Sequence, residues 1–145
     1  AEATRIFAAL ADMDWLRGRD RDAFSRGLAW VWGEITVVHP FRDVNTRSQF
    51  VFFNQLAAEA GWLIDWRRID SYVFGYARTV AIFADERGID ALLHPALERV
   101  EDASHSSMTQ AMRKGAQSFS GPGELRTRAE LDRELQDAID RRGSG

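Results

Sequence analysis

Residues 38–49, VHPFRDVNTRSQ, bring together side chains that could act on a phosphate group. An unperturbed histidine has a pKa of about 6.5, so the imidazole of His39 is suited to take up a proton at neutral pH. Asp43 offers the hard oxygen ligand that Mg²⁺ prefers. Arg47 can donate paired hydrogen bonds to phosphate oxygens. A base, a metal ligand and an arginine therefore lie within one short segment, which predicts phosphate chemistry.

The same segment also has a purely structural interpretation. Asn45 and Thr46 are predicted at the start of a helix, where free backbone N–H groups attract anions. Thr46 and Gln49 have the three-residue spacing of a capping box. A histidine before a proline, followed by a capping residue, is also an ordinary connection between two helices. On the residues alone, both interpretations stay open.

Apolar residues at helical spacing predict the elements around this segment. The first helix is expected over about 2–17, and the second ends near Val38 because Pro40 disfavours helical geometry at His39. The third follows Thr46 and is apolar almost all round, which indicates a central position. A short connection with Trp62 and Trp66 leads to two further helices, a fourth that ends near residue 83 and a fifth over 89–100 that is shortened by a proline. No strand pattern is found, so the predicted fold class is all-α.

We expect three parts along the chain: a core over 1–101, a loose connection over 102–123 that is rich in Ser, Gly and Gln, and a C-terminal helix over 124–142. With 145 residues, 45% of them apolar, the chain can form one folded core. Its net charge of −3 argues against binding to nucleic acid in general. No apolar run reaches the roughly 20 residues of a membrane span. The absence of cysteine excludes a disulfide or a thiolate metal site.

The segment from His39 to Arg47, HPFRDVNTR, resembles the signature of the Fic family, H-x-F-x-[D/E]-G-N-G-R-x-x-R. The flanking stretches RDAFSRGLAWVWGEITVV and FFNQLAAEAGWLIDW are also similar to the family core, and the resemblance covers roughly residues 5–100. It implies a Fic-like helical bundle with a catalytic loop between two central helices. It also implies a nucleotidyltransferase that moves AMP from Mg-ATP to a Ser, Thr or Tyr hydroxyl of a target protein.

The resemblance also implies roles for individual residues. His39 would be the general base that takes the proton from the target hydroxyl, and Asp43 would hold Mg²⁺. Asn45 and Arg47 would contact the phosphates of ATP. Val44 and Thr46 would line the same phosphate-binding stretch.

Three positions depart from the signature: Val44 and Thr46 replace glycines, and Phe50 replaces the second arginine. Glycine permits a positive φ, which a β-branched residue resists, so we expect a narrower phosphate site and weaker activity. Two alternatives follow. One is a phosphotransferase like the death-on-curing branch, which would move the γ-phosphate. The other is a decayed Fic module that binds a partner without chemistry.

The resemblance also leads to expectations about how the activity would be inhibited and in which compartment the protein would act. Ser120 and Glu124 have part of the spacing of the family's inhibitory helix, but Pro122 disfavours a helix there. An inhibitor would then act in trans, like an antitoxin. The family's β-hairpin flap is not expected, because too few residues precede Ile6. The resemblance implies a toxin-like protein in the cytoplasm, or an effector that is delivered to a host cell.

Overall fold

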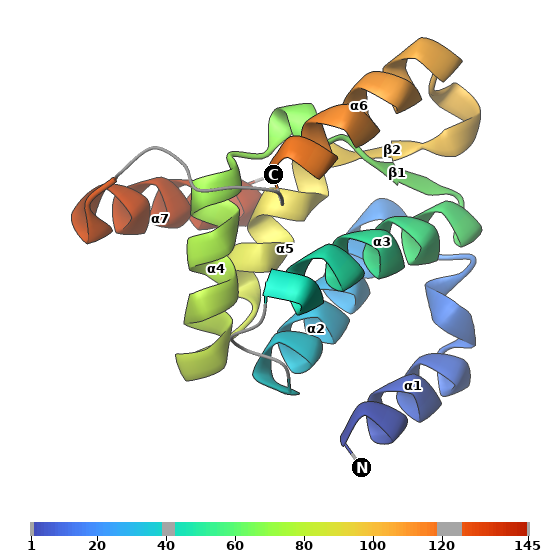
Figure 1. Cartoon of the computed structure of the whole chain (residues 1–145), viewed down its shortest axis with the longest axis horizontal. Coiled ribbons are helices and arrows are strands. Elements are labelled where there is room, and N and C mark those ends of the chain that lie inside the picture. Colours follow the sequence, from blue (N-terminus) through green and yellow to red (C-terminus); the bar gives the residue numbers. More distant parts are fainter. Residues whose placement is uncertain (1, 39–42, 119–125, 145) are drawn as a thin grey trace.

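The structure, a computed structural model, describes residues 2–38, 43–118 and 126–144. This part of the chain forms helices joined by short connections and one small sheet (Figure 1). The α-helices are α1 (Glu2–Asp12), α2 (Arg21–Val38), α3 (Asp43–Glu59), α4 (Ser71–Phe83), α5 (Arg87–Leu93), α6 (His105–Ser118) and α7 (Arg128–Ser144). The strands are β1 (Trp62–Ile64) and β2 (Leu97–Arg99). The predicted all-α class is confirmed.

The core is built around Trp32 of α2, a helix that packs against α1, α4 and α5. The indole ring lies nearly parallel to the ring of Phe53 in α3, with centroids 3.9 Å apart. Its edges meet Phe74 of α4 at 4.9 Å and Trp66 at 5.9 Å. Aromatic rings in such arrangements stabilise a core beyond the area that they bury. Trp32 therefore fixes three segments of the chain relative to one another.

The first helix is shorter than the sequence predicts. α1 ends at Asp12 and is followed by a turn, Asp14–Leu16, in which the φ angles are 52°, 54° and 63°. Left-handed backbone of this kind is unfavourable for residues other than glycine. Here the turn places Leu16 in the core with no exposed surface. Tertiary packing has overridden the local preference.

The small sheet was not predicted. β1 and β2 pair antiparallel, with Trp62 opposite Arg99 and Ile64 opposite Leu97. The sequence analysis gave a short connection at β1 and a helix over 89–100, whereas α5 ends at Leu93, before Pro95. Both assignments are therefore corrected. Strands of three residues are too short to show a period of two, and β1 is buried along its whole length, which hides any alternation.

A helix, α6, occupies His105–Ser118, within the stretch 102–123 for which the sequence analysis expected a loose connection. The inward face of α6 carries Met108, Ala111, Met112 and Gly115, at helical spacing. At Gly115 a Cβ atom would lie 2.5 Å from the ring of Phe50, so the close packing requires glycine. Small residues and methionine gave too weak an apolar signal in a segment rich in serine.

α7 overlaps the C-terminal helix predicted over 124–142, but it begins at Arg128 and ends at Ser144, and it packs against α4 and α5. Leu135 lies against Gly88 so closely that a Cβ atom there would be 2.8 Å from it. Arg142 forms an ion pair with Asp90 of α5, with Nε and Oδ2 3.2 Å apart. These contacts attach α7 to the core. The division of the chain into three parts remains a prediction.

Candidate active site

The junction of α2 and α3 contains the residues that the sequence analysis selected. α2 ends at Val38, as the proline at position 40 predicts, and α3 begins at Asp43. His39, the candidate base, falls in residues 39–42, outside the described part of the chain. Its role as a base therefore stays a prediction.

Four candidate residues form the start of α3. Asp43, Val44, Asn45 and Thr46 are its first four residues. The first four N–H groups of an α-helix have no acceptor within the helix, and this end carries a positive partial charge. Arg47 comes next, and its side chain is exposed to solvent. The candidates are thus gathered at a helix end that attracts anions.

The predicted capping box is wrong. α3 begins three residues before Thr46, which is therefore a helical residue and not the cap. Gln49, the expected partner in the box, is 6% exposed, and its Oε1 accepts a hydrogen bond from Nε1 of Trp32 at 3.2 Å. Gln49 attaches the second turn of α3 to α2. A four-residue sequence pattern could not reveal this tertiary contact.

The structure also changes what is expected of Val44, which replaces a glycine of the family signature. The sequence analysis expected this position to need a positive φ, which valine resists. As the second residue of α3, Val44 is in an α-helix, where φ is negative and β-branched side chains are tolerated. Backbone strain therefore gives no reason to expect a distorted site at Val44.

Phe50 stands where the family signature has its second arginine, and its surroundings are apolar. Its ring lies 5.8 Å from the ring of Trp66, beneath Gly115 of α6. Nε1 of Trp66 donates a hydrogen bond to Oδ1 of Asn54 at 2.9 Å, and Nδ2 of Asn54 donates to the backbone oxygen of Phe50 at 2.7 Å. Phe50 is an anchor between α3, α6 and the turn at Trp66.

Arg78 of α4 is a cation that the sequence analysis did not select. Its guanidinium carbon lies 5.7 Å from the ring centroid of Phe74, and its Nε atom is shielded from solvent. Burial lowers the pKa of this guanidinium from its ordinary value. The available sequence signal was its spacing of four from Phe74, which puts both residues on one face of a helix.

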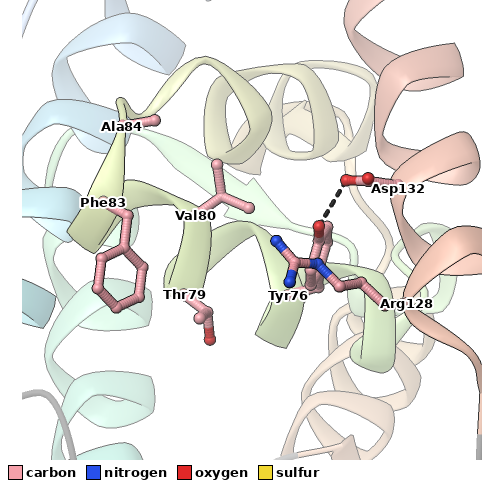
Figure 2. A pocket seen from close by; sticks show the side chains of 7 residues that line it. All are labelled: Tyr76, Thr79, Val80, Phe83, Ala84, Arg128 and Asp132. Carbon is pink, nitrogen blue, oxygen red and sulfur yellow. Dashed lines mark hydrogen bonds between the residues drawn. The ribbon is translucent and has the colours of Figure 1, made fainter.

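A pocket of about 500 Å³ lies between α4 and α7 (Figure 2). Its lining residues are Tyr76, Thr79, Val80, Phe83, Ala84, Arg128 and Asp132, none of which was selected from the sequence. The hydroxyl of Tyr76 donates a hydrogen bond to Oδ1 of Asp132 at 2.5 Å, which raises the pKa of Tyr76. The side chain of Phe83 is 81% exposed.

The other two histidines, His94 and His105, lie outside the signature-like segment. Nε2 of His94 lies 2.7 Å from Oδ1 of Asp22, and this hydrogen bond lowers the pKa of Asp22. The same carboxylate lies 3.7 Å from Arg142 of α7, so His94 belongs to a set of contacts between helices. His105 is exposed at the start of α6.

Residues 2–38, 43–118 and 126–144 contain no group of three or more acidic or histidine residues placed to hold a metal ion. In the same ranges, every helix is too short or too polar to cross a bilayer.

Comparisons with known proteins find relatives of this chain. No family model matches the chain. Over 70 residues, 48% of the chain, it is 41% identical to the probable protein adenylyltransferase y4lH of Sinorhizobium fredii. It is 35% identical to the protein adenylyltransferase VbhT of Bartonella schoenbuchensis over 63% of the chain. It is 31% identical to the probable protein adenylyltransferase Fic of Escherichia coli over 58%.

The matched regions cover 36%, 19% and 42% of these three relatives, so the chain corresponds to less than half of each. Over the matched regions, the chain is similar to proteins that are named protein adenylyltransferases.

Proposed function

We propose that this chain transfers AMP from ATP to a hydroxyl group of a target protein. The observation that carries the proposal is the similarity to relatives that are named protein adenylyltransferases. The position of the signature-like residues at the start of α3 supports it, because the free N–H groups there suit the phosphates of a nucleotide.

In the proposed reaction, His39 accepts the proton of the target hydroxyl. The hydroxyl oxygen then attacks the α-phosphorus of ATP and forms a new P–O bond. The bond between the α-phosphorus and the oxygen that bridges it to the β-phosphorus breaks, and pyrophosphate leaves with the electron pair. Asn45 and Arg47 bind phosphate oxygens and hold the reacting groups in line, while the backbone of Val44 and Thr46 contributes to the anion site.

Asp43 is the proposed ligand for Mg²⁺. The residues fit this ion, because Mg²⁺ at a nucleotide commonly takes only one or two protein carboxylates and completes its shell with phosphate and water. Asp43 is the first residue of α3, beside the N–H groups proposed to bind phosphate. Bound Mg²⁺ would offset the negative charge of the phosphates.

We propose a Ser, Thr or Tyr side chain of a protein as the acceptor. An inhibitor would act in trans, like an antitoxin, because Pro122 disfavours an internal inhibitory helix. Ser120 and Glu124 lie outside the described residues. Because ATP is abundant in the cytoplasm, we place the activity there, in the producing cell or in a host cell that receives the protein.

Two labelled forms of ATP test the reaction. The protein is incubated with bacterial lysate and ATP labelled at either the α- or the γ-phosphate. We expect label on protein from the α position alone, with pyrophosphate released. Label from the γ position alone would overturn the proposal in favour of phosphotransfer. A folded protein that transfers neither label would favour a binding module.

The matched control for this experiment is His39→Ala. Without a base the attacking hydroxyl keeps its proton, so transfer should be abolished. The helix content measured by circular dichroism should stay the same, which separates lost chemistry from lost folding. Transfer that persists at the wild-type rate would remove His39 from the mechanism.

A further inference from the structure

An apolar groove of about 410 Å³ is lined by residues of α3, β1 and α6 and by Val100. These elements lie next to one another in Figure 1. None of the residues that line the groove is charged. Val51 of α3 is 61% exposed, and Met108 and Met112 line the groove from α6. Apolar surface gathered in one groove is typical of a binding site for a protein or a ligand.

The polar side chains of the groove already have partners. Oδ1 of Asn54 accepts a hydrogen bond from Trp66, and Nδ2 of Asn54 donates to the backbone oxygen of Phe50. Nε2 of Gln55 donates to Oε1 of Glu59 at 3.5 Å. An occupant would therefore gain affinity chiefly by burying apolar side chains. The flexible side chains of methionine adapt to such partners, which is why they are common on surfaces that bind protein segments.

The groove has a direction along α3. At one end Gly115 of α6 packs against Phe50, in the first half of α3. At the other end the backbone N–H of Val100 donates to the oxygen of Gly61 at 3.0 Å, just beyond the last residue of α3. The groove therefore follows α3 from its first half to its C-terminal end.

The end at Phe50 leads to the candidate active site. Arg47 precedes Val51 by one helical turn, so both residues lie on the same face of α3, and both are exposed. Asp43 precedes Val51 by eight residues, about 12 Å along the helix axis. An extended chain covers that distance in about four residues. A segment held at Val51 could thus place a residue four positions away at the start of α3.

The opposite end of the groove is acidic. Glu59 is exposed and bonded to Gln55, which lines the groove, and the exposed Glu101 directly follows Val100. Charge complementarity at this end favours an occupant with lysine or arginine there. The groove therefore prefers a segment that is basic at one end and apolar in the middle.

We propose that this groove binds an extended apolar segment of the target protein and presents a hydroxyl about four residues away to the start of α3. The inference rests on the proposed function for the role of that hydroxyl as the acceptor of AMP. It assigns the choice of target to a surface that is separate from the nucleotide chemistry.

A fluorescent peptide tests the groove directly. It contains two lysines, a leucine and an isoleucine, three alanines and one threonine, in that order, and is made in both chain directions. We expect one direction to bind, as measured by fluorescence anisotropy. Replacing its two apolar residues by glutamine, or its lysines by glutamate, should weaken binding. No binding in either direction would overturn the inference.

Val51→Gln and Phe83→Gln are the matched variants, because each replaces an exposed apolar residue and only Val51 lines the groove. Val51→Gln should bind the peptide about fivefold to tenfold more weakly, since the burial of one valine is lost. Phe83→Gln should change binding by less than about twofold. Met112→Gln should repeat the loss from the side of α6, with thermal unfolding as the check on folding. Equal affinities in Val51→Gln and Phe83→Gln would contradict the proposal.

Transfer of α-labelled AMP to the peptide separates this inference from the proposed function. We expect Val51→Gln to raise KM for the peptide and to leave the calorimetric affinity for ADP unchanged. Peptide binding without transfer would support the groove and refute the proposed function. Transfer to lysate proteins that Val51→Gln and Met112→Gln do not alter would support the function and refute the groove. A dimer that Val51→Gln dissociates in analytical ultracentrifugation would show a contact between copies instead, which overturns the inference.

Discussion

The indole Nε1 of Trp32 donates a hydrogen bond to Oε1 of Gln49 over 3.2 Å, within the most buried part of the structure. This bond joins α2 to α3 on the two sides of the segment that contains His39. From sequence spacing alone, Trp32 would be assigned to the apolar core and Gln49 to a helix cap. Their contact instead fixes how the start of α3 is placed.

We expect Gln49→Leu to lower the free energy of unfolding by about 1–3 kcal/mol, because Nε1 of Trp32 would remain buried without an acceptor. Urea denaturation measures the change. Gln55→Leu is the matched control on the same helix, since Gln55 is exposed, and its effect should stay within about 0.5 kcal/mol. Equal effects from the two variants would show that the hydrogen bond contributes little.

The sequence predicted the part of the fold that depends on apolar spacing and on proline. The end of α2 at Val38 follows from Pro40, and α3 is a long helix in the core as expected. The sequence did not predict α6, because the packing face of this helix consists of glycine, alanine and methionine. The contact between Gly115 and the ring of Phe50 joins residues 65 positions apart, and no local pattern contains that information.

Gly115→Ala should destabilise the protein, although alanine is the better helix former. The added Cβ would lie 2.5 Å from both Phe50 and Trp66, and rigid rings cannot yield easily. We expect a net loss of about 1–3 kcal/mol in thermal or urea unfolding. Gly143→Ala in α7 is the control, because its Cβ would meet nothing within 4 Å. That variant should be stabilised by up to about 1 kcal/mol. Stabilisation of both variants would contradict the close packing.

Thr36→Val should stabilise the protein. Thr36 is 5% exposed, and within the described part of the chain its hydroxyl makes no hydrogen bond. Replacing this buried polar group by a methyl group removes its desolvation cost, which predicts a gain of about 1 kcal/mol. Thr79→Val is the comparison, because the Thr79 hydroxyl donates to the backbone oxygen of Gly75 at 3.2 Å. A loss of stability in Thr36→Val would reveal a partner for its hydroxyl.

The sequence suggested which residues could form the candidate site, but not how the fold places them. The residue types from His39 to Arg47 gave the chemical hypothesis, while the start of α3 at Asp43 and the partner of Gln49 required the fold. Residues that meet through tertiary contacts leave no local spacing to detect.

The contact between Asp22 and His94 predicts a loss of stability in acid. The hydrogen bond to His94, followed by the charge of Arg142, lowers the folded-state pKa of Asp22 below its ordinary 3.8. Such a carboxyl stabilises the fold above its unfolded pKa, and this contribution disappears as the pH falls through the folded pKa. The stability difference between wild type and Asp22→Asn should therefore be constant just above pH 3.8 and shrink below it. Urea unfolding over this range is the measurement; a difference that grows in acid would contradict the assignment.

Phe50→Arg tests whether the arginine of the family signature can simply be restored. The new guanidinium would enter a space bounded by Trp66 and Gly115, in place of a packed ring. We expect a loss of about 2 kcal/mol or more in the free energy of unfolding. Phe50→Leu, which stays apolar, should lose less. Affinity for ADP should not rise in Phe50→Arg, since the position is occupied by packing contacts between α3 and α6. Tighter ADP binding with unchanged stability would instead mean that this position faces the phosphates and can accept a charge.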